Sequence, residues 1–490
     1  MKVLFIYPNL MLQATIPNSI AILSACLKKE GHIVKLFDTT YYKTEEISNE
    51  EKRIQRFQIK PFEIKKLIET PVEEDLIKTV ELYKPELIAI TFVDNTLQLG
   101  IRLLRKIRHT KIPVIAGGVT AILRPEELAS KEEIDYVCYG EGENAIVKII
   151  EYLEGKLPLQ DVPNICYRST KGKKTTIMYN KPDDLVDINI IPFEDYTIFD
   201  QERLMRPMSG KIIKTVTINM DRGCPYSCTY CCAPSLRKHY GKGYYRRKTI
   251  ERIQAELEYQ IKLHQPKYIY FNSETFLAVS DEEFKRFAEM YKNYQIPFWC
   301  QTHIKTITDV KIRLLKEIGC DKIGIGIESG NENYRKNRLK KTFTNNEAIE
   351  AFKILDKYNV AVGVNNIIGL PEETRKLIFD TIRLNRRLNK ILHGRMSTSG
   401  FIFQPYKGTE LYTYCINNKY LSPDQEPDTL IGDPVIENPY LSKQELSGLL
   451  RTFSLYVKMP IWYYPLIRIA EKNDTMLAFV GKIFWKKYAG

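Results

Sequence analysis

Residues 221–232, Asp-Arg-Gly-Cys-Pro-Tyr-Ser-Cys-Thr-Tyr-Cys-Cys, directly follow an apolar, β-branched stretch from Thr215 to Asn219. Cys224, Cys228 and Cys231 have the spacing C-x-x-x-C-x-x-C. Three thiolates this close on one loop can wrap a cubane cluster and ligate three of its irons. The fourth iron is then left with an open coordination position. Catalysis at the cluster requires such a position, whereas electron storage does not.

Zinc is the main alternative for these cysteines. Structural zinc sites take four ligands, typically from paired C-x-x-C units, and neither a second pair nor a His-x-x-x-His follows nearby. Adjacent side chains have difficulty reaching one metal, so we expect Cys232 not to be a ligand. The other cysteines are scattered singly, most of them in apolar stretches typical of core positions: Cys26, Cys138, Cys166, Cys300, Cys320 and Cys415.

Apolar strands and amphipathic helices alternate downstream of the cysteines. With residues 215–219 they make six strand–helix units, too few for a closed eight-stranded barrel. We therefore predict a partial (β/α)6 TIM-type barrel over residues 206–412, and a mainly helical extension over 413–490. The other expected strands are 268–271, 297–301, 322–327, 361–368 and 397–403.

The same alternation fills residues 1–155 and predicts a doubly wound parallel sheet. A polar insert, roughly residues 43–78, is typical of charged surface helices. Residues 156–205 are proline-rich, and we expect a linker with a small hairpin and a crossing strap. The expected strands of the first sheet are 3–7, 33–37, 87–92, 113–116 and 136–139.

Ligands of such sheets bind beyond the carboxyl ends of the strands. No G-x-G-x-x-G follows the first strand, so the ordinary NAD fingerprint is absent. Each glycine there could by itself serve only a tight turn. The residues at these ends that we expect to contact a ligand are Tyr7, Asn9, Thr91, Gly117, Gly118 and Gly140.

Composition places the chain among ordinary globular proteins, with 490 residues, 44% hydrophobic and 27% charged. Lys and Arg exceed Asp and Glu by 73 to 60, but the basic residues are spread along the chain, which argues against nucleic acid as a partner. No apolar run reaches the ~18 residues of a membrane span. Pro8 and Asn9 end the first apolar stretch without a cleavage site, so we expect a cytoplasmic protein.

The cysteine motif resembles the signature of the radical S-adenosylmethionine (SAM) enzymes, whose cores are partial barrels of six strands. That resemblance implies a [4Fe–4S] cluster on Cys224, Cys228 and Cys231, with SAM chelating the open iron. It also implies an electron donor such as flavodoxin or ferredoxin.

Residues 1–155 resemble the flavodoxin-like cobalamin-binding domains that precede some radical SAM domains. The segments that carry the resemblance are Val3-Leu-Phe-Ile-Tyr-Pro, Val114-Ile-Ala-Gly-Gly and Asp135-Tyr-Val-Cys-Tyr-Gly-Glu-Gly-Glu. The Asp-x-His-x-x-Gly motif of the wider cobalamin family is missing. The chain as a whole thus resembles the class B radical SAM methyltransferases, and the resemblance implies cobalamin as a second cofactor.

Four further residues match places where radical SAM enzymes contact SAM. Tyr230 stands where the family has an aromatic residue beside the adenine. Glu274, in Asn272-Ser-Glu-Thr-Phe, matches the element that holds the SAM amino group. Glu328 and Ser329, in Gly324-Ile-Gly-Ile-Glu-Ser-Gly, match a motif near the SAM ribose or carboxylate. No catalytic acid–base side chain is conspicuous, because cofactors carry this chemistry.

The resemblance implies a mechanism. Reductive cleavage of SAM gives methionine and a 5′-deoxyadenosyl radical, which removes hydrogen from the substrate. Methylcobalamin then methylates the substrate radical, and a second SAM remakes methylcobalamin. We therefore expect methylation of an unactivated carbon in a small-molecule or peptide substrate.

Other functions use related machinery. The same cofactors could support cyclisation, ring contraction or oxidation without methyl transfer. RNA methylthiolation would need three more cluster cysteines in the first domain, and Cys26, Cys138 and Cys166 lie on an expected helix, strand and linker. A non-catalytic scaffold would need a broken cluster motif, and this motif is intact.

Overall fold

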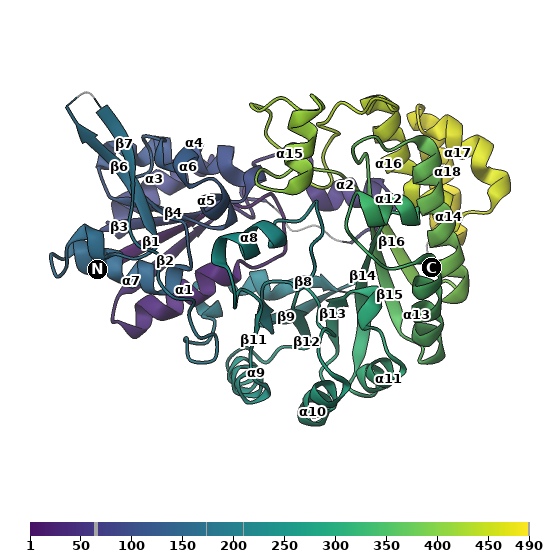
Figure 1. Cartoon of the computed structure of the whole chain (residues 1–490), viewed down its shortest axis with the longest axis horizontal. Coiled ribbons are helices and arrows are strands. Elements are labelled where there is room, and N and C mark those ends of the chain that lie inside the picture. Colours follow the sequence, from purple (N-terminus) through teal and green to yellow (C-terminus); the bar gives the residue numbers. More distant parts are fainter. Residues whose placement is uncertain (63–66, 173, 209, 489–490) are drawn as a thin grey trace. The chain divides into compact units, whose positions relative to one another are not determined.

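The computed structural model describes residues 1–62, 67–172, 174–208 and 210–488. It divides into two compact units (Figure 1). Unit 1 comprises residues 1–49, 64–203 and 235–244, and unit 2 comprises residues 50–63, 204–234 and 245–490. No helix of the described chain is long and apolar enough to cross a membrane.

Unit 1 contains a seven-stranded sheet in the order β2-β1-β3-β4-β5-β6-β7. Strands β1 to β5 are parallel, so the predicted doubly wound sheet with flavodoxin-like strand order is confirmed. The hairpin predicted between residues 156 and 205 is present, and its first strand pairs antiparallel with β5. The strands are β1 (Lys2–Tyr7), β2 (Ile33–Asp38), β3 (Leu87–Thr91), β4 (Val114–Gly117), β5 (Tyr136–Cys138), β6 (Ile165–Lys171) and β7 (Lys174–Tyr179).

Helices of unit 1 bury apolar faces against this sheet. Leu76 and Val80 of α3, and Leu103 and Leu104 of α4, belong to the same buried cluster as the strand residue Leu4. Such helices are held mainly by the burial of one apolar face. The main helices are α1 (Asn18–Lys29), α3 (Val72–Tyr83), α4 (Leu97–Ile107), α5 (Val119–Leu123), α6 (Pro125–Ala129) and α7 (Gly142–Leu153).

Unit 2 contains a second seven-stranded sheet, in the order β16-β15-β14-β13-β12-β9-β8. Six strands are parallel, and β8 (Met205–Met208) joins one edge antiparallel. The first and last strands of the sheet are not paired, so the curved sheet in Figure 1 is an open barrel, as predicted. The parallel strands are β9 (Lys211–Asn219), β12 (Tyr268–Asn272), β13 (Phe298–Thr302), β14 (Cys320–Glu328), β15 (Ala361–Ile368) and β16 (Met396–Ile402).

Helices follow the strands of unit 2, and the predicted C-terminal helical region is present. Several begin at a side-chain cap; the Thr374 hydroxyl, for example, accepts from Leu377 N–H at the start of α14. The helices are α9 (Ile250–His264), α10 (Asp281–Tyr291), α11 (Asp309–Glu317), α12 (Glu332–Asn337), α13 (Asn345–Lys357), α14 (Arg375–Ile391), α15 (Glu410–Asn417), α16 (Lys443–Lys458), α17 (Tyr464–Ala470) and α18 (Asp474–Lys487). Helix α8 (Ala233–Tyr240), which follows the cysteine motif, belongs mostly to unit 1.

The prediction of a solvent-facing polar insert at 43–78 is wrong for its first half. Helix α2 (Asn49–Gln55) and the residues after it pack within unit 2. Gln58 is buried and donates to the Gly400 carbonyl of β16 at 2.7 Å. Polar residues can be buried here because a tertiary partner, invisible in the local sequence, satisfies their hydrogen bonds. Residues 63–66 of the insert lie outside the described chain.

Candidate active site

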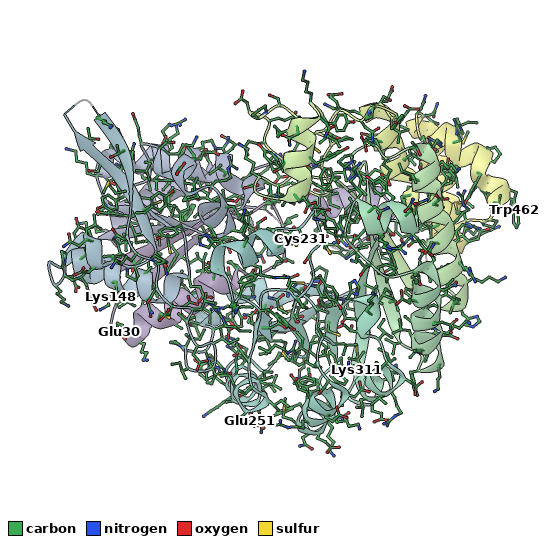
Figure 2. All side chains as sticks on the ribbon, viewed as in Figure 1. Glu30, Lys148, Cys231, Glu251, Lys311 and Trp462 are labelled. Atoms are coloured by element: carbon green, nitrogen blue, oxygen red, sulfur yellow. The ribbon has the colours of Figure 1, made fainter. Side chains whose placement is uncertain are left out.

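The three motif cysteines lie on the loop between β9 and α8, at the carboxyl end of the first parallel strand of unit 2. Cys224, Cys228 and Cys231 are half-buried and form no disulfide with any described residue; Figure 2 labels Cys231. A turn closes the loop where Cys231 N–H donates to the Cys228 carbonyl at 3.2 Å. Accessible thiols on a tight loop fit an iron–sulfur cluster better than a core role.

Burial, together with the nearby charge of Glu274, raises the pKa of the Cys224 thiol to about 11. A thiolate is the form that binds iron, and positive charge beside it is what stabilises that form. The residues of the loop itself add little positive charge beside the three thiols. These thiols therefore suit a cationic iron cluster, whose own charge stabilises the thiolate form. Within the described chain, no three His, Cys, Asp or Glu side chains converge on one metal ion.

The Cys232 side chain lies beside that of Cys231. Its thiol lies within hydrogen-bonding range of the Cys231 thiol, and this contact, together with burial, raises the pKa of Cys231. The two adjacent thiols thus lie close together, although we expect Cys232 not to share a metal with Cys231. Its exclusion as an iron ligand stays a prediction.

Tyr230 and Glu328 meet beside the cysteine loop. The Tyr230 hydroxyl donates to Glu328 Oε1 at 3.0 Å, and its ring packs on an apolar cluster that includes Leu339 and Phe403. Lys341 Nζ donates to the same Glu328 oxygen at 2.9 Å and lies 3.4 Å from the Tyr230 hydroxyl. We call Tyr230, Glu328 and Lys341 the polar triad.

The backbone of β14 creates the space for this triad. Glu328 has a φ of 62°, and the register of β14 against β15 shifts between Gly326 and Glu328. A Cβ at Gly326 would lie 2.1 Å from Glu328 Oε1 and 2.8 Å from Lys341 Nζ. Glycine is needed there because the buried ion pair lies directly over its Cα.

Ser329 follows Glu328 and is fully buried. No described residue accepts from or donates to its hydroxyl. A buried hydroxyl without a partner costs free energy unless something else bonds to it. The polar triad and this hydroxyl are therefore suited to a small polar ligand such as the amino-acid end of SAM.

Glu274 lies on the turn after β12, apart from the polar triad but close to the cysteines. Its charge raises the pKa values of Cys224 and Cys231. Its own pKa is raised by desolvation and then by the charge of Asp221, although its side chain is exposed. Asp221 Oδ2 in turn accepts from Arg247 Nη1 at 2.9 Å and from Ser273 Oγ at 2.5 Å.

Two residues near the cysteine loop belong to no recognised sequence motif and could not be identified from the sequence. Lys341 completes the polar triad but lies in a polar loop without periodicity. His303, after β13, stacks on Tyr226 of the cluster loop with ring centroids 4.0 Å apart. Burial and nearby cations lower the pKa of His303 to about 3, so the ring is neutral.

The predicted cobalamin contacts of unit 1 fall into two groups. A Cβ at Gly117 would meet nothing within 4 Å, and Gly118 has a φ of 98° and passes close to the Thr91 hydroxyl. The space over the Cα of Gly117, at the end of β4, is therefore open to a ligand, although its carbonyl accepts from Phe92 N–H within the sheet. Tyr7, at the end of β1, is half-buried, and burial raises its pKa.

Asn9 and Gly140 already have partners within unit 1. The Asn9 amide donates to Gln13 O at 3.0 Å and Thr40 Oγ1 at 2.7 Å. A Cβ at Gly140 would collide with the Asn164 side chain at 2.5 Å. The structure thus gives both residues a role in holding loops, and contact with cobalamin stays a prediction for them.

Comparison with known proteins identifies both halves. Residues 218–384 match the radical SAM superfamily, and residues 12–150 match the B12 binding domain. The chain is a radical SAM enzyme with a B12-binding domain. Its cofactors are accordingly a [4Fe–4S] cluster, SAM and cobalamin.

Relatives of this radical SAM enzyme include methyltransferases and cyclases. An uncharacterized methyltransferase of Pyrococcus horikoshii is 25% identical and covers 77% of this chain and 79% of its own length. Cytidylyl-2-hydroxyethylphosphonate methyltransferase of Streptomyces wedmorensis is 22% identical, covering 86% and 83%. An anaerobic magnesium-protoporphyrin IX monomethyl ester cyclase of Rubrivivax gelatinosus is 23% identical, covering 65% and 57%.

Solved structures share the fold of this radical SAM enzyme. The radical SAM methyltransferase TsrM of Kitasatospora setae, with cobalamin and a [4Fe–4S] cluster bound, gives a TM-score of 0.64 at 13% identity, covering 85% of this chain and 78% of that one. The cobalamin-dependent enzyme OxsB, with cobalamin and SAM bound, gives 0.66 at 14% identity, covering 99% and 75%.

Proposed function

We propose that this enzyme methylates an unactivated carbon of a small-molecule or peptide substrate. The observation that carries the proposal is that one chain contains both cofactor domains. Two relatives that match it over most of their length are methyltransferases. When bound, the cluster and SAM supply a radical that removes hydrogen from the substrate, and cobalamin supplies the methyl group.

The residues of unit 2 bind and orient in this proposal. Cys224, Cys228 and Cys231 hold three irons, and the polar triad with Ser329 holds the polar end of SAM. The Lys341 ammonium neutralises Glu328, so this part of the site adds no net charge. In the same proposal Glu274, whose charge acts on Cys224 and Cys231, binds the SAM amino group.

Formation of S-adenosylhomocysteine tests the proposal without knowledge of the substrate. Methylation of reduced cobalamin by SAM releases one S-adenosylhomocysteine per cobalamin even without a methyl acceptor, whereas cyclisation or oxidation with the same cofactors releases none. We expect the anaerobically reconstituted protein, with reductant and SAM, to form S-adenosylhomocysteine together with 5′-deoxyadenosine. Formation of 5′-deoxyadenosine alone would overturn methyl transfer and favour the cyclase-type reaction.

A further inference from the structure

Two residues, Thr229 and Tyr230, stand between the second and third motif cysteines. Tyr230 belongs to the polar triad. Thr229 is buried, although the cysteines on either side of it are only half-buried. A buried polar side chain in a loop is expected to bond to a neighbouring segment, so its partners show what the cysteine loop is attached to.

Thr229 bonds to two segments that are distant in the sequence. Its hydroxyl donates to the Arg338 carbonyl at 2.7 Å, and its N–H donates to the Leu339 carbonyl at 3.2 Å. Its own carbonyl accepts from Leu411 N–H of α15 at 3.0 Å. The cysteine loop is therefore attached both to residues 338–341, which follow α12, and to α15.

The loop of residues 338–341 also carries the lysine of the polar triad. Lys341 Nζ donates to Glu328 Oε1 at 2.9 Å and lies 3.4 Å from the Tyr230 hydroxyl. The adjacent residues Thr229 and Tyr230 thus contact the start and the end of this loop. Together these contacts form a closed ring that joins the cysteine loop to the polar triad.

The loop of residues 338–341 is fixed on its other side as well. The Arg338 guanidinium donates to Glu372 and lies over the Tyr414 ring, 4.0 Å from its centroid. The Tyr414 hydroxyl of α15 donates to the same carboxylate at 2.8 Å. Because α15 and the residues after β15 hold this loop, the bonds of Thr229 fix the cysteine loop to a rigid neighbour.

The hydroxyl bond is the part of this attachment that depends on the residue type at 229. The N–H and carbonyl bonds are made by the main chain and are available to any residue except proline. Valine has nearly the shape of threonine but lacks the hydroxyl, whereas serine keeps the hydroxyl. Substitutions at 229 can therefore remove this one bond and restore it.

We propose that Thr229 is a positioning residue that holds the cysteine loop at a fixed separation from the polar triad through residues 338–341. SAM bound at the triad also has to reach the open iron on the cysteine loop. A fixed separation lowers the cost of ordering the site when SAM binds. The proposal deepens the proposed function and rests on its placement of SAM at the polar triad.

Equilibrium dialysis of SAM against the reconstituted protein, without reductant or substrate, tests this role. Thr229→Val should keep the iron content of the wild type and bind SAM about fivefold more weakly, the equivalent of one buried hydrogen bond. Thr229→Ser should restore the affinity. The change that SAM causes in the electron paramagnetic resonance signal of the reduced cluster should require correspondingly more SAM in the valine variant.

Thr452→Val is the matched control. Thr452 of α16 is fully buried, and its hydroxyl donates to the Gly448 carbonyl at 2.8 Å. Both valine variants should lose stability, but Thr452→Val should bind SAM as the wild type does. Wild-type affinity in Thr229→Val, an equal loss of affinity in Thr452→Val, or failure of serine to restore binding overturns the proposal.

Arg338→Met provides the test if Thr229→Val does not hold iron. This variant leaves the cysteine loop unchanged and removes the guanidinium that anchors residues 338–341. Weaker SAM binding at full iron content supports the proposal, and wild-type affinity overturns it. Because SAM binding is measured without turnover, failure to form S-adenosylhomocysteine would refute methyl transfer without changing this result.

Discussion

At the scale of single residues, the most constrained position is Gly326. The Glu328–Lys341 ion pair lies over it, and both side chains are buried. Such a pair is costly to break, since removing one partner leaves the other charge unpaired. Gly326 is therefore as important to the candidate SAM site as the charged residues themselves.

Gly326→Ala should weaken SAM binding about tenfold, because the added methyl group overpacks the site and displaces Glu328. The measurement is equilibrium binding of SAM to the reconstituted enzyme. Gly363→Ala is the matched control on the next strand, where the nearest atom, at 3.3 Å, belongs to the flexible Lys322 side chain. Equal affinity in the Gly326→Ala and wild-type enzymes would contradict the placement of SAM at the polar triad.

The two adjacent cysteines give a second prediction at this scale. Cys231→Ser should lose the site-differentiated [4Fe–4S] cluster, whereas Cys232→Ser should keep it, since only Cys231 belongs to the three-cysteine motif. Iron content and the electron paramagnetic resonance signal of the reduced protein measure this. If loss of Cys232 also abolishes the cluster, the ligand set is wrong.

At the scale of elements, the segment after α2 joins the barrel strand β16 to the C-terminal helices. Phe57 packs against Phe484 and Trp485 of α18, with ring centroids 5.4 and 5.9 Å away. Phe57→Ala should lower the free energy of unfolding by about 2 kcal/mol, because it leaves a cavity in a half-buried contact. Chemical denaturation measures the change, and Phe479→Ala, at an exposed position of α18, should have little effect.

The loop after β15 contains a carboxyl that makes stability depend on pH. Burial raises the pKa of Glu373 to about 8 from an ordinary 4.5, although the N–H groups of Gly369 and Leu370 donate to it. Between these values the folded chain keeps a proton that the unfolded chain releases. The contribution of Glu373 is therefore fully present below about pH 4.5 and is lost as the pH rises toward 8.

Glu373→Gln should abolish this dependence, raising Tm at pH 8 by a few °C relative to wild type while changing it little at pH 5. Thermal unfolding at the two pH values measures the difference. Glu350→Gln, at an exposed pair on α13, is the control. An equal change of Tm at pH 5 and pH 8 in the Glu373 variant would mean that the carboxyl does not titrate between these pH values.

At the scale of the whole molecule, the cofactor sites belong to separate units. The cysteine motif and polar triad are in unit 2, and the open backbone at Gly117 is in unit 1. Cys228→Ala should therefore lose the cluster but still bind cobalamin at near-unit stoichiometry, as measured by absorbance after reconstitution. Loss of cobalamin in this variant would show that the two cofactors do not bind independently.

The sequence by itself determined both folds and most of the candidate cluster site. Alternating strands and helices are local signals, and three cysteines within eight residues of one loop lie close together whatever else surrounds them. Tyr230, Glu274 and Glu328 could be named because the short segments around them match motifs of the radical SAM family.

Only the tertiary structure decided which charges are paired and which are not. Lys341 joins Glu328 across a loop, α2 packs within unit 2 although it follows β2 of unit 1 in the sequence, and Lys322 crosses β15 to reach Ser397 of β16. These contacts depend on side chains brought together by chain folding, so no periodicity records them. The cysteine motif thus identifies the chemistry, whereas the pairing of charges around it comes from contacts between residues distant in the sequence.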